Sequence, residues 1–277
     1  MQEHPEPAAE PEPEFIAVGE GGALRRIAVR RRTGTAAPGL MWLCGFNSEM
    51  SGTKAVALDR FAAAQGRSCV RFDYSGHGVS GGAFTEGTIS RWLEESLAVF
   101  DACCRGPQVL VGSSMGGWIT LLLTRELRRR EPAGRAAFPA GLVLIAPAVD
   151  LTEELMWKRF PEAVKREITT TGQWLRPSSY SETPHPITAG LIEDGRRHLL
   201  LGGLVETGCP VRILQGIKDP DVPYGHTLEL VSRLARDDVV MSLVKDGDHR
   251  LSRPQDIDRM LRTVAECCAA TPASTVN

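Results

Sequence analysis

Ser114 is the residue of this sequence whose surroundings most suggest covalent catalysis. It lies in Gly112-Ser-Ser-Met-Gly116, with glycine two positions before and two positions after it, a spacing that Ser113 lacks. Such glycines let a chain turn sharply from a strand into a helix, and the turn presents the serine hydroxyl at the helix N-terminus, where developing negative charge is stabilised. The apolar run 108–112 and the amphipathic stretch 115–130 predict such a strand and helix. We therefore predict that Ser114 is a nucleophile.

A serine nucleophile needs a general base, usually a histidine, and a carboxylate that orients this base. When the serine lies at a strand-to-helix turn, the usual chain order is serine, acid, histidine. Asp219 follows the predicted strand 210–215 and is the favoured acid, while Asp221 and Asp150 are alternatives. His249 follows both the acid and the last predicted strand, so it is the predicted base.

The oxygen that becomes negative when a serine attacks a carbonyl carbon is stabilised by backbone N–H groups. We expect one of these donors to be Met115, the residue after the nucleophile. The other is expected in the loop after the apolar run 39–45, most simply at Phe46. The predicted oxyanion site therefore consists of backbone groups and does not depend on particular side chains.

A second glycine pattern, Gly76-His-Gly-Val-Ser-Gly81, has the form of a dinucleotide-binding loop. Such a loop must lead directly into a helix, because the pyrophosphate lies on the helix N-terminus. Here Gly82 and Gly87 delay the predicted helix to about Thr88. The pattern therefore indicates a turn beside the entrance of the site, and we expect no nicotinamide cofactor.

The elements that must position these residues alternate between apolar strands and amphipathic helices. Strands are predicted at 23–32, 39–45, 68–73, 108–112, 141–146, 210–215 and 239–244, and helices at 54–65, from about 88, and at 115–130, 224–236 and 255–269. This alternation predicts an α/β fold with a mostly parallel central sheet and helices on both faces. The first strand, with its alternating basic residues, is expected at the sheet edge.

Residues 151–208 interrupt the alternation, because they contain no convincing strand pattern. An insertion of this length is too long for a plain loop, and we predict that it forms a helical cap over the site. The insertion carries the aromatic residues Trp157, Phe160 and Trp174. They are candidate substrate-binding residues that line an acyl channel, and the alternative is that they only pack the insertion together.

The composition is that of an ordinary globular protein. The 277 residues include Lys+Arg 32 and Asp+Glu 34, for a net charge of -2, which argues against a nucleic-acid partner. We expect no membrane span, because no apolar run is long enough. The seven cysteines form no C-x-x-C pair, which indicates reduced thiols, no metal site and a cytoplasmic location. Residues 1–22 are expected to be a disordered acidic, proline-rich lead, residues 23–272 the catalytic domain, and 273–277 a tail.

Several segments together resemble one known family. The order Ser114, Asp219, His249 is that of the α/β-hydrolase superfamily. The stretches 44–54, 71–76, 112–118 and 248–250, CGFNSEMSGTK, RFDYSG, GSSMGGW and DHR, are similar to the mitochondrial abhydrolase-domain acyl-protein thioesterases, also known as mycophenolic acid acyl-glucuronide esterases. The resemblance covers about residues 23–270. It implies an α/β-hydrolase fold, a serine–aspartate–histidine triad without a cofactor, and S-palmitoyl proteins or acyl glucuronides as substrates.

The residues and the resemblance together predict a serine hydrolase that cleaves carboxylic esters or thioesters through an acyl-enzyme on Ser114. The substrate is then a small molecule or an acylated protein. Two alternatives are kept. The same fold and triad support other chemistry, namely perhydrolase, C–C hydrolase or aminopeptidase reactions, and a non-catalytic ligand receptor has this fold as well. The acidic start of the chain favours a bacterial cytoplasmic relative over a mitochondrial protein.

Overall fold

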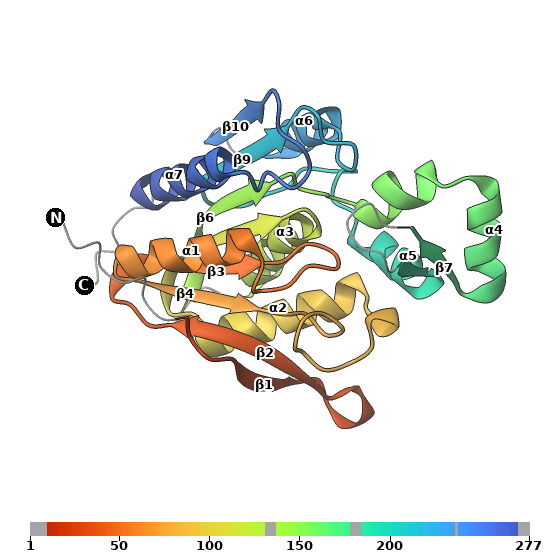
Figure 1. The fold of residues 1–277 in the computed structure, drawn as a ribbon, viewed down its shortest axis with the longest axis horizontal. Helices are drawn as coiled ribbons and strands as arrows, with labels where there is room; N and C mark the ends of the chain where they lie inside the picture. The colour runs from red at the N-terminus through yellow and green to blue at the C-terminus, as the bar shows by residue number, and fades with distance from the viewer. Residues whose placement is uncertain (1–9, 131–136, 178–183, 236–237, 271–277) are drawn as a thin grey trace.

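A computed structural model describes residues 10–130, 137–177, 184–235 and 238–270. Its centre is an eight-stranded sheet with the strand order β1-β2-β4-β3-β5-β6-β9-β10 (Figure 1). These strands are β1 Glu14–Val18, β2 Arg25–Arg32, β3 Ala36–Leu43, β4 Arg67–Phe72, β5 Gly106–Ser113, β6 Ala137–Ile145, β9 Val211–Gly216 and β10 Val239–Val244. From β4 to β10 all neighbours pair in parallel, whereas β2 is antiparallel to both β1 and β4. The sheet is therefore mostly parallel, as predicted.

Helices cover both faces of this sheet, as Figure 1 shows. They are α1 Thr53–Ala64, α2 Ile89–Cys103, α3 Met115–Arg129, α6 Tyr224–Arg233 and α7 Pro254–Ala270. Helices α1 and α7 contact each other on one face, and α2 and α3 contact each other on the other. The central strands are buried on both faces, which explains why segments such as Leu40–Leu43 are continuously apolar. The predicted α/β architecture, with helices on both faces of the sheet, is confirmed.

The first strand corrects two expectations. Residues 14–18 fall in the segment expected to be disordered, yet they form β1, which pairs with Arg25–Val29 of β2. The strand is stabilised because Val18 is buried and the Arg26 guanidinium lies 4.2 Å from the centre of the Phe15 ring. As a result β2 is the second strand and not the edge. Residues 1–9 and the predicted tail at 273–277 lie outside the described residues.

The insertion at 151–208 lies beyond the carboxyl ends of the central strands, at the right of Figure 1. It contains a π-helical turn at Leu151–Met156, a 3₁₀ turn at Trp157–Arg159, α4 Glu162–Thr171, β7 Gln173–Arg176, β8 His185–Thr188, α5 Ala189–Gly195 and a 3₁₀ turn at Arg196–His198. Because β7 and β8 pair as an antiparallel hairpin, the expectation of a purely helical insertion is wrong. Gly172, with φ 85°, ends α4 in the left-handed conformation and leads directly into this hairpin.

A single carboxylate joins the two ends of the insertion. Asp150, in the left-handed region with φ 54°, accepts hydrogen bonds from the N–H groups of Leu200 and Leu201 at 2.8 and 3.0 Å. Burial raises the pKa of Asp150, and the two N–H donors oppose that shift. The carboxylate of Asp150 therefore holds the segment that returns from the insertion to β9 in place.

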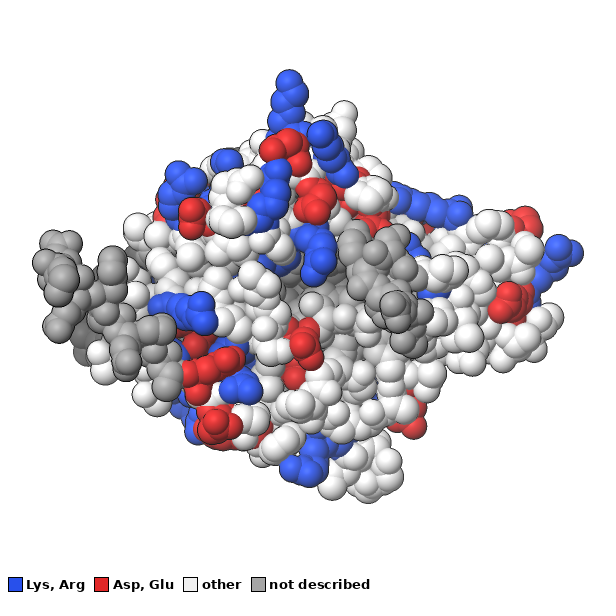
Figure 2. Space-filling model, viewed as in Figure 1, with Lys and Arg blue, Asp and Glu red and all other residues white. Residues whose placement is uncertain are grey.

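The visible surface and the cysteines match what the composition predicts. Acidic and basic side chains are interspersed over the face shown in Figure 2. All seven cysteines are thiols and not disulfides, and all but the half-buried Cys103 are buried. Among the described residues, no helix combines the length and apolar character needed to cross a bilayer.

Candidate active site

The turn between β5 and α3 holds Ser114 in a strained backbone conformation. Its φ of 55° and ψ of −122° are unusual for a residue with a side chain. A Cβ atom on Gly112 would lie 2.4 Å from the carbonyl oxygen of Gly116, and one on Gly116 would lie 2.1 Å from that of Leu43. The two glycines are thus required for the turn to close, and the N–H of Ser114 donates to Ile145 at 2.8 Å to fix it against β6.

The structure brings Ser114, Asp219 and His249 together although they are far apart in the sequence. The Nε2 atom of His249 lies 3.0 Å from the Oγ of Ser114, and its Nδ1 atom lies 2.8 Å from Oδ2 of Asp219. The carboxylate of Asp219 is buried and also accepts hydrogen bonds from the N–H groups of Asp221 and Val222, at 2.9 and 2.8 Å. These donors fix the orientation of the carboxylate toward the imidazole.

The two alternative acids occupy other positions. Asp221 donates its backbone N–H to Asp219, and its own carboxylate lies 3.7 Å from the Arg176 guanidinium. Asp150 holds the base of the insertion, as described above. The geometry therefore favours Asp219 as the partner of the histidine.

The backbone N–H groups of Phe46 and Met115, the predicted oxyanion donors, belong to the two segments that adjoin Ser114. Neither donates to any acceptor within the described part of the chain, so both remain available to a substrate oxygen. The loop that carries Phe46 passes close to the nucleophile, since a Cβ atom on Gly45 would lie 3.3 Å from the Cβ of Ser114. Met115 begins α3, where the helix dipole adds a partial positive charge.

A buried histidine that sequence reasoning did not select supports this loop. The N–H of Asn47 donates to Nε2 of His77 at 3.1 Å, and Nδ1 of His77 lies 3.1 Å from the carbonyl oxygen of Ser75. The ring is therefore the neutral form with its proton on Nδ1, and burial lowers its pKa to about 4. The side chain of Asn47 also reaches His185 of β8, with 3.0 Å between Nδ2 and Nε2.

The glycine pattern 76–81 packs against the carboxylate of Asp73, which supports the same loop. Asp73, buried at the end of β4, accepts the N–H groups of Met50 and Val79 at 2.6 and 3.0 Å. A Cβ atom on Gly78, which has φ 47°, would lie 2.1 Å from this carboxylate. The glycine lets the backbone approach an aspartate that holds the far end of the Phe46 loop.

The loop that carries His249 is also restrained from α1. The Nζ of Lys54 donates to the carbonyl oxygen of Arg250, the residue after the histidine, and lies 3.4 Å from the Oγ of Ser252. Leu251 has a strained φ of 44°, and its N–H donates to Asp248 at 2.9 Å. Burial and the neighbouring Arg250 charge lower the pKa of Lys54 to about 8. The motifs GTK and DHR, separate in the sequence, thus meet in space.

Comparison with known proteins identifies the family. A sequence pattern described as "Alpha/beta hydrolase family" matches residues 34–265, which is more than half of the chain. The chain belongs to the alpha/beta hydrolase family. The human palmitoyl-protein thioesterase ABHD10, mitochondrial, is 35% identical to this hydrolase over 242 residues, which cover 87% of this chain and 76% of that protein.

Two solved structures resemble this alpha/beta hydrolase closely. A putative hydrolase from Agrobacterium vitis has 49% sequence identity and a TM-score of 0.90, covering 93% of this chain and 98% of that one. The alpha/beta hydrolase domain-containing protein 10 from mouse has 34% identity and a TM-score of 0.79, covering 92% and 97%. The resemblance to the ABHD10 thioesterases is thereby confirmed. Since the human relative is named as mitochondrial, the cytoplasmic location stays a prediction.

Two cavities of this hydrolase meet at Ser114 and His249. One, of about 220 Å³, reaches under the insertion and is lined by Phe46, Asn47, Leu151, Leu155, Met156, Arg176, Pro177, His185, Asp221 and Val222. The other, of about 230 Å³, reaches toward α1 and is more polar, with Ser48, Glu49, Lys54, Arg250 and Ser252 in its wall. The nucleophile therefore lies between a cavity with apolar residues of the insertion in its wall and a cavity with charged residues of α1 and the His249 loop in its wall.

The aromatic residues of the insertion do not line either cavity. Phe160 and Trp174 pack edge to face with ring centres 5.2 Å apart, and the Arg196 guanidinium lies 5.1 Å from the centre of the Trp157 ring. These contacts favour the alternative that the three residues pack the insertion together, and their role in substrate binding stays a prediction. The cavity wall is formed instead by Leu151, Leu155 and Met156 of the π-helical turn, which carry no aromatic signal in the sequence.

The same hydrolase site contains a grouping that resembles a metal site. Asp219, Asp221 and His249 place possible ligand atoms within 4.8 Å of one another. Both oxygens of Asp219 already accept hydrogen bonds, from His249 on one side and from backbone N–H groups on the other. This bonding satisfies the carboxylate without a cation and suits an aspartate that orients a histidine.

Proposed function

We propose that this protein is a serine hydrolase that cleaves carboxylic esters or thioesters through an acyl-enzyme on Ser114. The observation that carries the proposal is the continuous hydrogen-bonded chain from Ser114 through His249 to Asp219, at 3.0 and 2.8 Å. An aspartate on Nδ1 keeps Nε2 as the acceptor that faces the hydroxyl. This arrangement is suited to deprotonating a serine as it attacks a carbonyl carbon.

The reaction then proceeds in two steps. His249 takes the proton of Ser114, the Oγ atom bonds to the carbonyl carbon, and the N–H groups of Phe46 and Met115 stabilise the oxyanion. The C–O or C–S bond breaks, and His249 returns the proton to the departing alcohol or thiol. A water molecule, deprotonated by His249, attacks the acyl-enzyme in the same way and releases the carboxylic acid and Ser114.

The cavities indicate where the two parts of the substrate lie. The cavity under the insertion suits an acyl chain, because Leu151, Leu155 and Met156 offer apolar surface. The cavity toward α1, with Lys54 and Arg250 in its wall, then receives the leaving group. Thioesters enter the proposal because the relative at 35% identity is named a palmitoyl-protein thioesterase.

Replacement of the nucleophile tests this proposal directly. Ser114→Ala is expected to abolish hydrolysis of nitrophenyl esters and acyl thioesters, and labelling by a fluorophosphonate, while the control Ser113→Ala keeps both. Acyl chains from two to sixteen carbons are assayed with the wild type. Full activity and labelling in Ser114→Ala would show that the assignment of the nucleophile is wrong. A sharp preference for the shortest chains would count against a palmitoyl substrate.

A further inference from the structure

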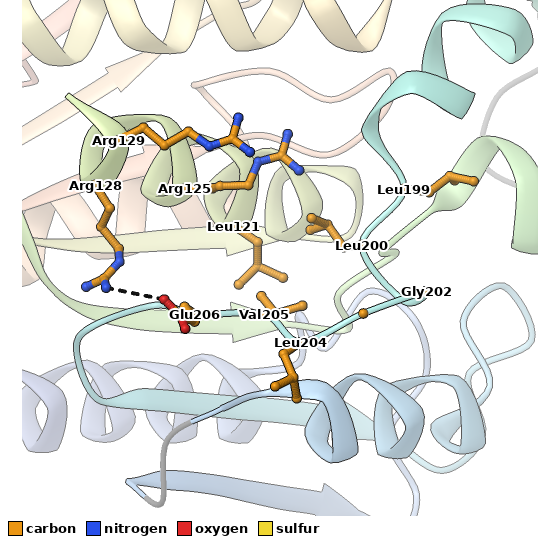
Figure 3. Close-up of a pocket in the computed structure, with 11 residues that line it drawn as sticks. Leu121, Arg125, Arg128, Arg129, Leu199, Leu200, Gly202, Leu204, Val205 and Glu206 are labelled. Carbon is orange, nitrogen blue, oxygen red and sulfur yellow. Dashed lines mark ion pairs between the residues drawn. The ribbon is translucent and has the colours of Figure 1, made fainter.

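A cavity of about 560 Å³ lies at the other end of α3 from the nucleophile. It is formed by the last turns of α3 and by residues 199–206, the segment that returns from the insertion to β9 (Figure 3). The helix rises about 1.5 Å per residue, so the α3 residues that line this cavity lie roughly 10 to 22 Å along the helix from Ser114. Its volume falls in the range of about 300–1,000 Å³ that is usual for small-molecule sites.

The polar side of this cavity carries more positive than negative charge. Arg125, Arg128 and Arg129 line it. Glu126 is shared between Arg125 at 3.4 Å and Arg129 at 3.1 Å, and Glu206 lies 3.7 Å from Arg128. Three guanidinium groups thus face two carboxylates. The Nε atom of Arg125, the atom that lies 3.4 Å from Glu126, is buried and makes no hydrogen bond within the described part of the chain.

The opposite side of the cavity is apolar. Figure 3 shows Leu121 of α3 facing the segment that carries Leu200, Leu204 and Val205. Leu204 is 77% exposed and Leu199 is 41% exposed, although both are large apolar side chains at the rim of a cavity. Covering such side chains with an apolar ligand removes about 25 cal/mol of unfavourable hydration per Å².

We propose that this cavity binds a long-chain carboxylate, with its head group at Arg125 and Arg129 and its alkyl chain along the leucines. A single negative charge matches the one unbalanced positive charge, and the planar carboxylate fits the guanidinium fork. The ligand also covers Leu204. The proposal does not require Ser114 to be a nucleophile.

Calorimetry with sodium dodecanoate, below its micelle concentration, tests the site on the full chain carrying Ser114→Ala, so that turnover plays no part. Dodecanoate is expected to bind, and Arg125→Gln is expected to weaken this binding about tenfold, the loss of a charge-assisted hydrogen bond. Leu204→Gln, at an exposed position where misfolding is not expected, weakens it as well. Dodecanol is expected to bind more weakly than dodecanoate.

Two controls separate this site from its neighbours. Arg130→Gln changes an arginine that pairs with Asp101 outside the cavity, and it is expected to leave the affinity unchanged. Leu155→Trp fills the cavity at Ser114, so it is expected to remove any second binding event there and to leave the affinity of the cavity at the end of α3 unchanged. The proposal is overturned if dodecanoate does not bind, or if Arg125→Gln does not affect its binding. It is also overturned if only Leu155→Trp removes dodecanoate binding, or if the protein binds anionic phosphatidylglycerol vesicles but not free dodecanoate.

Discussion

The backbone N–H of Asn47 donates to Nε2 of the buried His77 at 3.1 Å, one residue away from a proposed oxyanion donor. The ring also packs against Phe84 and Trp92, with ring centres 5.0 and 5.3 Å away, and the Phe46 ring contacts the same two residues. His77 therefore fixes the Phe46 loop by a hydrogen bond and by packing, although it does not touch the nucleophile.

Removal of this acceptor is expected to lower kcat. We predict that His77→Leu lowers kcat about tenfold to a hundredfold with little change in KM, because the oxyanion donor is less well placed. His77→Gln keeps an acceptor near the Nε2 position and is expected to recover part of the loss. Steady-state kinetics measure both variants, and circular dichroism checks that they fold. Equal losses in the two variants would contradict a role for the hydrogen bond.

The same histidine is expected to make stability depend on pH. Its pKa is about 4 in the folded protein and 6.5 in the unfolded chain, so between these values the unfolded chain binds more protons. The contribution of His77 to the free energy of unfolding is therefore fully present above pH 6.5 and is lost as the pH falls toward 4. We expect the free energy of unfolding to fall by about 2 kcal/mol from pH 7 to pH 5 through this residue. Urea unfolding measures it, and His77→Gln should lack this part of the slope.

Lys54 is expected to act on the reaction through the carbonyl group of Arg250. Lys54→Met removes the donor that restrains the His249 loop and is predicted to lower kcat/KM about tenfold, the value of a charge-assisted hydrogen bond. The wild type should lose activity as the pH rises through about 8, because the amine then loses its charge. A pH profile from 6.5 to 10 tests this. If Lys54→Met shows the same fall near pH 8, the fall has another origin.

The choice between two neighbouring carboxylates can be tested by a matched pair of variants. Asp219→Asn is expected to lower kcat by about 10⁴, because the amide favours the wrong tautomer of His249. Asp221→Asn keeps the backbone N–H that donates to Asp219, so we expect a change of less than about threefold. Both are measured with the same nitrophenyl ester. A larger loss in Asp221→Asn would reverse the assignment.

The size of the cavity under the insertion, where we propose that the acyl chain binds, is expected to set the preferred chain length. Leu155→Trp adds volume to the wall of the cavity and is expected to shift the preference toward shorter acyl chains. Trp174→Leu alters a residue that packs within the insertion, so it should lower the melting temperature and leave the chain-length profile unchanged. Hydrolysis of an ester series measures the profile. A shift caused only by Trp174→Leu would restore the aromatic residues as substrate contacts.

The sequence was sufficient to predict which three side chains meet at the candidate site, because each follows a strand at the same edge of a parallel sheet. The position of Ser114 between glycines and of His249 after the last strand depends on local pattern and chain order alone. The supports of the Phe46 loop were missed because they are contacts between distant residues, such as Asp73 with Met50. The hydrophobic periodicity of a sequence does not predict such a contact, although the glycines of segment 76–81 indicated a turn beside the site.

The errors in the insertion and at the start of the chain have a similar origin. Strands β7 and β8 have four residues each, which is too short for alternation to be recognised. Strand β1 is stabilised by pairing with β2. The sequence did not predict this strand because it directly follows a proline-rich segment that is typical of disorder. Aromatic residues in the insertion suggested a ligand, but whether they face a cavity or one another is decided by tertiary packing.

The rate at which the buried cysteines react can report how often parts of this protein unfold locally. Burial raises the pKa of Cys69 and of Cys267 to about 12, so neither is a thiolate at neutral pH while the sheet is intact. An alkylating reagent can therefore react with these cysteines only after a strand or helix has separated from the core. The rate at which each cysteine is modified then records how often its own part of the fold comes apart, without any introduced label.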